Sequence, residues 1–177
     1  MLNWIRSFLS ERTHSIKMES YRSNTQSLTC GVPQGSALSP LFFNCYMRPL
    51  ADLITSYGLG CQIYADDTQI LADLASGPNM PEQLNKGLSN IQQWMDSNRL
   101  GLNADKTELL LIGPQANSTF LPAWPSSFGP APTPAKQVKN LGIIFDAELS
   151  FVTHAKYCIK SANYHLQLLR KIKNLFT

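Results

Sequence analysis

The sequence predicts an α+β fold, in which short strands and amphipathic helices alternate along 177 residues. Two observations support this prediction: apolar residues recur every three or four positions in some segments, and short apolar stretches lie between turn residues in others. A third is that the adjacent acids Asp66 and Asp67 interrupt an apolar strand pair at its turn. The order of these elements favours a mostly antiparallel sheet with packed helices.

The N-terminal segment predicts a short helix followed by a hairpin. Residues 2–9 place their apolar side chains on one helical face. Residues 15–19 and 26–29 have strand-like composition, and the polar residues 21–24 between them predict the turn.

A buried helix and a second hairpin are predicted next. Ser39 is expected to cap a helix over residues 41–57, with Pro40 at its first position and Gly58 beyond its end. Residues 61–74 then predict two short strands joined at Asp66-Asp67.

The C-terminal half alternates helix and strand around a proline-rich loop. A helix is expected to open at Asn79 and Pro81, because Leu84, Leu88, Ile91 and Met95 recur at helical spacing. Strands are expected at residues 107–112 and 141–145, and a final helix over residues 152–174. Residues 113–135 should lack regular structure, because prolines occur at positions 114, 122, 125, 130, 132 and 134.

Composition limits the class of protein without deciding it. The net charge of +3 is too small to indicate a nucleic-acid partner by itself. No apolar run has membrane-spanning length and no secretory cleavage pattern is present, so a cytoplasmic or nuclear protein that is not secreted and has no membrane contact is expected. Charge distribution is more informative, because the segment from Leu149 onward has no acid and five basic residues: Lys156, Lys160, Arg170, Lys171 and Lys173. This segment is a candidate phosphate-facing surface.

Two motifs carry the candidate chemistry. Adjacent carboxylates at a hairpin tip repel each other unless a cation lies beside them, and their hard oxygens suit Mg²⁺. Taken alone, Asp66-Asp67 is better explained by a solvated turn. The second motif, Gly31-Val32-Pro33-Gln34-Gly35-Ser36, places glycines around a rigid dipeptide, so its backbone could lie against a flat partner such as a base pair. A type II turn that leads into a helix would use the same residues.

Together, the hexapeptide at residues 31–36 and Tyr64-Ala65-Asp66-Asp67 resemble the palm of reverse transcriptases of non-LTR (LINE-type) retrotransposons. The resemblance extends through Trp94, Asn98 and residues 102–108. It continues at residues 141–146 and 149–151 and at His154, which look like the primer grip and the entry to the thumb, and so covers most of the chain.

This resemblance implies a partial right-hand polymerase palm at residues 1–112, the proline-rich loop at 113–137, and a primer-grip-like strand with a thumb-like basic helix at 138–177. It implies that Asp66 and Asp67 are catalytic ligands of Mg²⁺. Residues implied to lie against the nucleotide or the template are Pro33, Gln34, Gly35, Tyr64 and Lys106. The implied partners are an RNA template, a DNA primer and deoxynucleoside triphosphates, and the five basic residues of the last segment would follow the nucleic-acid backbone.

Three roles remain open at this stage. Lys106 is implied to neutralise departing pyrophosphate, but a surface lysine beside Glu108 is an equal alternative. The C-terminal basic residues could form a solvated helix face. The chain as a whole could also be a noncatalytic nucleic-acid-binding remnant, or a decayed copy with no function of its own.

The sequence departs from the family at one catalytic position. Two-metal phosphoryl transfer needs carboxylates that clamp both ions, and the family supplies a third aspartate from an upstream strand. The only acids before Gly31 are Glu11 and Glu19, and the basic fingers segment is missing too. We therefore expect no primer extension by this chain alone, and poor cover over Ile63 and Ile70 on the hairpin.

Overall fold

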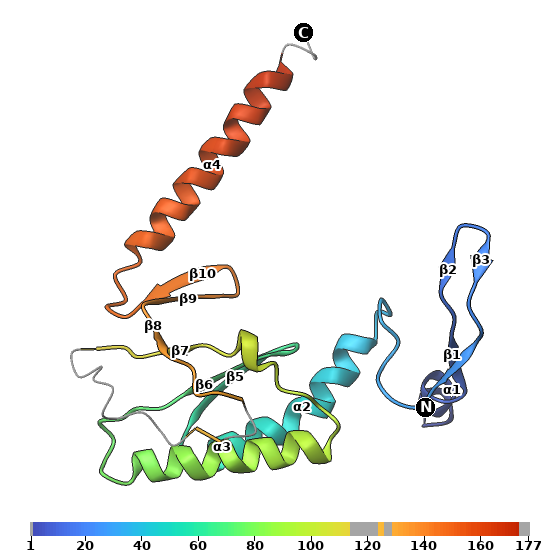
Figure 1. Cartoon of the computed structure of the whole chain (residues 1–177), viewed down its shortest axis with the longest axis horizontal. Helices are drawn as coiled ribbons and strands as arrows, with labels where there is room; N and C mark the ends of the chain where they lie inside the picture. The colour runs from blue at the N-terminus through green and yellow to red at the C-terminus, as the bar shows by residue number, and fades with distance from the viewer. Residues whose placement is uncertain (1, 114–123, 126–128, 174–177) are drawn as a thin grey trace. The chain divides into compact units, whose positions relative to one another are not determined.

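The computed structural model describes residues 2–113, 124–125 and 129–173 of the chain. The fold mixes helices with short strands, as the α+β prediction requires (Figure 1). The chain divides into two compact units, Met1–Leu71 and Ala72–Thr177. The strands pair two by two, in four antiparallel ladders and one parallel ladder among the described residues. Antiparallel pairing is therefore confirmed as the main type, but the strands form separate ladders in place of one sheet.

The first unit contains two helices and three strand pairs. Its elements are α1 (Leu2–Leu9), β1 (Arg12–His14), β2 (Lys17–Met18), β3 (Tyr21–Arg22), β4 (Gln26–Leu28), α2 (Ser39–Ser56), β5 (Gly60–Tyr64) and β6 (Asp67–Leu71). Helix α1 has the predicted bounds. The N-terminal hairpin also forms, by pairing of β1 with β4 and of β2 with β3. Its turn lies between Met18 and Tyr21, where Glu19 has a positive φ of 54°, and not at residues 21–24.

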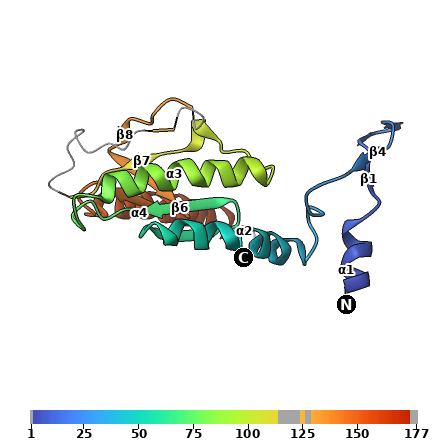
Figure 2. The same cartoon turned by 90° about the horizontal axis from the view of Figure 1, so that it is seen from below.

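Helix α2 provides the core of the first unit. Leu50 and Ile54 are 1% and 0% exposed, and Met47 and Leu59 are also buried. The helix lies against β5, so it supports the β5–β6 hairpin from one side (Figures 1 and 2). At its start, the prediction that Ser39 is the N-cap is wrong, because Leu38 occupies that position. Ser39 lies inside the helix, where its hydroxyl donates to the carbonyl oxygen of Pro33 and so ties the preceding loop to α2.

The second unit contains the remaining elements. These are α3 (Met80–Ser97), a 3-10 turn η1 (Ala104–Lys106), β7 (Leu109–Leu110), β8 (Pro134–Ala135), β9 (Gln137–Asn140), β10 (Ile143–Asp146) and α4 (Val152–Lys173). Helix α3 follows Asn79 as predicted, and Met80, Leu88 and Ile91 on its apolar stripe are buried. Helix α4 also follows its prediction, except that Asn174 lies outside the described residues.

The proline-rich segment contains a strand that the sequence did not predict. Residues 114–123 and 126–128 of this segment lie outside the described residues. Pro134–Ala135 nevertheless pairs in parallel with β7. Proline is tolerated there because a short edge strand leaves its missing N–H without a required partner.

The strand predicted at residues 141–145 is one arm of a hairpin. β10 pairs antiparallel with β9, and the two-residue turn Leu141-Gly142 joins them with φ values of 45° and 87°. Positive φ at both turn positions matches the right-handed twist of paired strands. The sequence did not predict β9, because only one of its four residues is apolar.

Candidate polymerase palm site

The two aspartates lie at the tip of the β5–β6 hairpin. Strand pairing runs from Gly60↔Leu71 to Tyr64↔Asp67, which leaves Ala65 and Asp66 as the connecting residues. The turn is therefore one residue earlier than Asp66-Asp67, and Asp67 begins β6. Ala65 has a positive φ of 52°, a conformation in which a small side chain is least hindered.

The hairpin has one exposed and one half-buried face near this tip. Cross-strand partners lie on the same face of a ladder, so the side chains of Tyr64 and Asp67 are neighbours. Tyr64 is 65% exposed, and both aspartates are exposed. The opposite face carries Ile63 and Ile70, which are half-buried.

The tip offers two hard oxygen ligands to a cation. Two exposed carboxylates on a short turn fit a divalent ion as part of its ligand set, because such an ion relieves their mutual repulsion. In the described part of the chain, no group of three His, Cys, Asp or Glu side chains is placed to hold a metal ion. The Mg²⁺ site expected at Asp66 and Asp67 therefore stays a prediction.

The loop at residues 31–36 forms a turn that presents Gln34. The amide of Ser36 donates to the carbonyl oxygen of Pro33 at 3.4 Å, and Gly35 has a φ of 82° at the third turn position. Gly31 has a φ of 76°. A Cβ at either glycine would meet no described atom within 4 Å, so backbone conformation and not crowding demands glycine here. Gln34 and Gly35 are exposed and Pro33 is half-buried.

Arg12 holds this loop from the side of α1. Its guanidinium Nη2 donates to the carbonyl oxygens of Cys30 at 3.1 Å and Gly31 at 2.6 Å. Its Nε donates to the last carbonyl of α1, that of Leu9, at 3.0 Å. Sequence reasoning missed Arg12. The available signal was an arginine just after a helix, where a cation can bind the free carbonyls of the last turn.

Lys106 lies in the second unit, at the end of η1. Its side chain is exposed, and its backbone amide donates to the carbonyl oxygen of Asn103 at 3.1 Å. Its contact with nucleotide or pyrophosphate stays a prediction.

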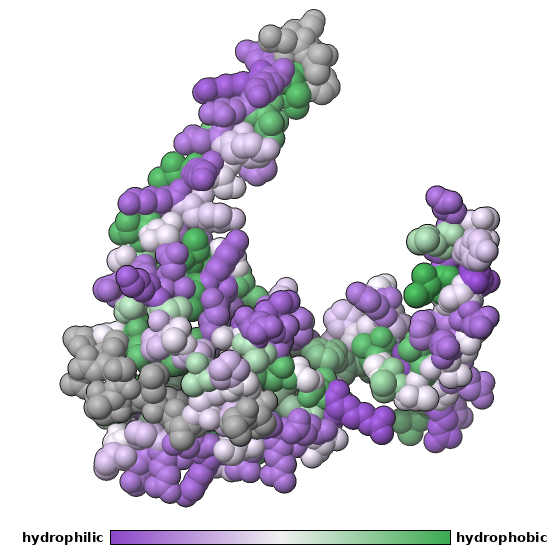
Figure 3. Space-filling view, viewed as in Figure 1, coloured by the Kyte–Doolittle hydropathy of each residue, from purple (hydrophilic) through white to green (hydrophobic). Residues whose placement is uncertain are grey.

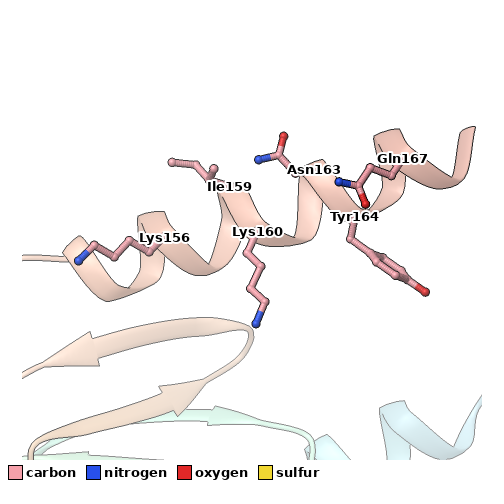
Figure 4. A pocket seen from close by; sticks show the side chains of 6 residues that line it. All are labelled: Lys156, Ile159, Lys160, Asn163, Tyr164 and Gln167. Carbon is pink, nitrogen blue, oxygen red and sulfur yellow. The ribbon is translucent and has the colours of Figure 1, made fainter. Parts of the chain in front are cut away.

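Helix α4 carries the predicted basic residues on an exposed surface. Lys156, Lys160, Arg170, Lys171 and Lys173 are all exposed, and none of the described residues of α4 is buried. Lys156 and Lys160 border a shallow hollow together with Ile159, Asn163, Tyr164 and Gln167 (Figure 4).

The start of α4 is fixed to the β9–β10 hairpin by Asp146. This carboxylate is 8% exposed. It accepts hydrogen bonds from the amide of Ser150 at 2.7 Å, the hydroxyl of Ser150 at 3.1 Å and the amide of Phe151 at 2.9 Å. The amide of Ser150, followed by these other donors, lowers the pKa of Asp146 below its ordinary value. Sequence reasoning placed this segment at the primer grip but did not identify Asp146 as the acceptor for the two residues that precede α4.

Comparison with known proteins gives the family. The family model described as reverse transcriptase (RNA-dependent DNA polymerase) matches residues 1–145. The RNA-directed DNA polymerase from mobile element jockey of Drosophila melanogaster is 29% identical over 156 residues. That match covers 85% of this chain and 17% of the relative.

Two further relatives support the assignment. The jockey polymerase of Drosophila funebris is 28% identical, over 85% of this chain and 17% of its own length. The probable RNA-directed DNA polymerase from transposon BS of Drosophila melanogaster is 24% identical, over 96% of this chain and 19% of its own length. No solved structure matches the chain.

The chain therefore spans less than a fifth of the length of these curated relatives. Because the family model covers most of the chain, the prediction of a non-LTR retrotransposon reverse transcriptase is confirmed at the level of the family. The chain belongs to the reverse transcriptase (RNA-dependent DNA polymerase) family.

Proposed function

We propose that this chain is the palm core and the start of the thumb of an RNA-directed DNA polymerase, and that it works as part of a longer protein. The observation that carries the proposal is the pair of exposed carboxylates, Asp66 and Asp67, on the β5–β6 turn. The family match over residues 1–145 supports it, because that match includes both this turn and the loop at residues 31–36.

In this proposal, Asp66 and Asp67 are two of the ligands of the catalytic ions, for which Mg²⁺ is the expected metal. A bound divalent ion would lower the pKa of the primer hydroxyl and neutralise charge on the transferred phosphoryl group. Ala65 leaves room for the primer end because its side chain is small. Gln34 would lie against the nascent base pair, and Pro33 and Gly35 would set the backbone that presents it.

Two further residues have proposed roles at the nucleotide. Tyr64, beside Asp67, offers an exposed aromatic face to the incoming deoxynucleoside triphosphate or the template. Lys106 would neutralise the pyrophosphate that leaves. The template would be RNA and the primer DNA, as the family implies.

We further propose that the 177-residue chain by itself does not extend a primer. Two carboxylates cannot clamp both ions of a two-metal site, so another segment of a longer protein would contribute the third. The same segment would cover the half-buried face that carries Ile63 and Ile70.

Binding of Mn²⁺, which can be followed by electron paramagnetic resonance, tests the metal site directly. We expect one weak Mn²⁺ site in the purified chain, and its loss in a variant with Asp66→Asn and Asp67→Asn. The matched control is Asp52→Asn, which removes an exposed carboxylate of α2 that pairs with Arg48 on the same helix. Unchanged Mn²⁺ binding in the double variant would refute the proposed role of the aspartates.

A second candidate function is noncatalytic binding of nucleic acid by α4. The observation that favours it is the exposure of five basic side chains on a segment without acids. Such binding would weaken with salt, because phosphate contacts release counterions. Fluorescence anisotropy with a labelled RNA–DNA duplex at several salt concentrations measures this, and each lost contact in a Lys160→Gln or Lys171→Gln variant should reduce the salt slope by about one. Salt-independent binding, or none, would exclude this function.

A further inference from the structure

Hydrogen bonds, more than apolar packing, determine the conformation of the loop at residues 31–36. None of the described residues before Ser39 is buried. In Figure 3 the N-terminal hairpin that leads to this loop, at the right of the view, shows purple and pale side chains with few green ones. Because apolar cover is small here, each hydrogen bond to the loop backbone has a large share in holding the loop.

Arg12 makes two of these hydrogen bonds at the start of the loop. As the first residue of β1, it pairs with Leu28 of β4, shortly before Cys30. Its Nη2 donates to the carbonyl oxygens of Cys30 and Gly31, and its Nε donates to that of Leu9 in the last turn of α1. One planar guanidinium therefore joins the loop to α1 by three hydrogen bonds. Bonds from a charged donor are stronger than neutral ones.

A further hydrogen bond holds the loop from the side of α2. The hydroxyl of Ser39, a residue that is 6% exposed, donates to the carbonyl oxygen of Pro33. The same oxygen accepts from the amide of Ser36 and closes the turn around Gln34 and Gly35. The loop is thus held by its backbone, which leaves the side chain of the exposed Gln34 outside the anchoring bonds.

We propose that Arg12 is a positioning residue of the polymerase site, which holds the loop at residues 31–36 in the conformation that presents Gln34 to the nascent base pair. This inference rests on the proposed function of Gln34. It requires the fork of the guanidinium and not only its charge. A lysine ammonium has a single nitrogen, so it cannot reproduce the bonds by which Nε and Nη2 join α1 to the loop.

Backbone order parameters from NMR relaxation of the full chain test whether Arg12 holds the loop. In Arg12→Gln, the order parameters of Gly31, Gln34 and Ser36 should fall from about 0.85 to below about 0.6, while those of the β5–β6 hairpin stay near about 0.85. Arg12→Lys should cause the same loss. A loop that stays ordered in Arg12→Gln would overturn the proposal. So would an equal loss of order in the β5–β6 hairpin, because it would show a general role in stability.

The matched control is Arg22→Gln. Arg22 lies in the same N-terminal hairpin, where its Nε donates to the hydroxyl of Ser15 at 2.9 Å. Its replacement removes the same charge and also removes a hydrogen bond, but that bond stays within the hairpin. The order of the loop should therefore be unchanged in this variant. A loss equal to that in Arg12→Gln would show that the hydrogen bonds from Arg12 are not the cause, and would overturn the proposal.

A double-mutant cycle tests whether Arg12 acts through Gln34. Binding of a labelled RNA–DNA duplex, followed by fluorescence anisotropy, should weaken by about threefold or more in Arg12→Gln and in Gln34→Ala. Arg12→Gln should have no further effect in the Gln34→Ala background, and additive effects would overturn the proposal. Arg22→Gln again measures the effect of the charge alone. Unchanged affinity in Gln34→Ala would refute the proposed function of Gln34, whereas the order parameters decide separately whether Arg12 holds the loop.

Discussion

Gly35 has a backbone conformation that the turn at residues 33–36 requires, with a φ of 82° and no described atom near its missing Cβ. An alanine there would be strained, so Gly35→Ala should lower the free energy of unfolding by about 1 kcal/mol. Urea denaturation measures this. The matched control is Gly101→Ala, because a Cβ at Gly101 also meets no described atom within 4 Å but no positive φ is involved. An equal effect of the two substitutions would show that the turn does not need glycine.

Asp146 should make the stability of the protein depend on pH, and the direction of its pKa shift gives the sign of that dependence. Hydrogen bonds from Ser150 and Phe151 lower its folded-state pKa below the ordinary value near 3.8. A carboxyl with a depressed folded pKa contributes stability above its unfolded pKa, and this contribution disappears as the pH falls toward the folded pKa. Asp146→Asn should therefore destabilise the protein at pH 7 and flatten the loss of stability below about pH 4.

Urea unfolding at several pH values tests this expectation. Asp105→Asn is a suitable control, because Asp105 is exposed in η1. If Asp146→Asn and the parent chain lost stability in parallel on acidification, the hydrogen bonds to Asp146 would not be the cause.

At the scale of elements, the turn of the β9–β10 hairpin contains backbone strain at Leu141 that a substitution should relieve. Leu141 has a φ of 45° and is 46% exposed, so its side chain gains little from packing while its backbone is unfavourable. Leu141→Asn should raise the free energy of unfolding by about 0.5–1 kcal/mol, because Asn-Gly is the preferred pair in such turns. Ile143→Asn, at a strand position with similar exposure, should instead lower it. Urea denaturation measures the free energy of unfolding of both variants. A loss of stability in Leu141→Asn would contradict the expectation.

The elements differ in how far the sequence predicts them. The four helices, α1 to α4, can be predicted from the sequence, because apolar periodicity over two or more turns is a strong local signal. β8 and β9 are not, because a strand of two to four mostly exposed residues depends on its partner strand more than on its own side chains. The guanidinium of Arg12 bonds to the carbonyl of Cys30, which lies 18 residues along the chain, and the local pattern does not indicate this partner.

The candidate site was predictable to a similar degree. The two motifs identified the family, because they place a few residue types at fixed spacing, while the roles of Asp66, Asp67 and Gln34 stay predictions. The motif did not fix the position of the turn at Ala65-Asp66, because a four-residue pattern does not indicate which two residues connect the paired strands. The role of Asp146 was missed because its partners are backbone amides, which have no sequence signature.

At the scale of the whole molecule, one unit contains the two motifs that resemble a reverse-transcriptase palm, and the other contains a basic helix. The chain spans less than a fifth of the length of the curated relatives. No helix among the described residues is long and apolar enough to cross a membrane.

Template-directed primer extension by the purified chain is the most direct test of this account. An RNA template with an annealed DNA primer, the four deoxynucleoside triphosphates and Mg²⁺ would be supplied. The account predicts no extension product, because only two of the expected carboxylates are present. RNA-dependent synthesis that disappears in Asp66→Ala, and persists in the control Asp52→Asn, would contradict it and would show that this chain already contains a working polymerase site.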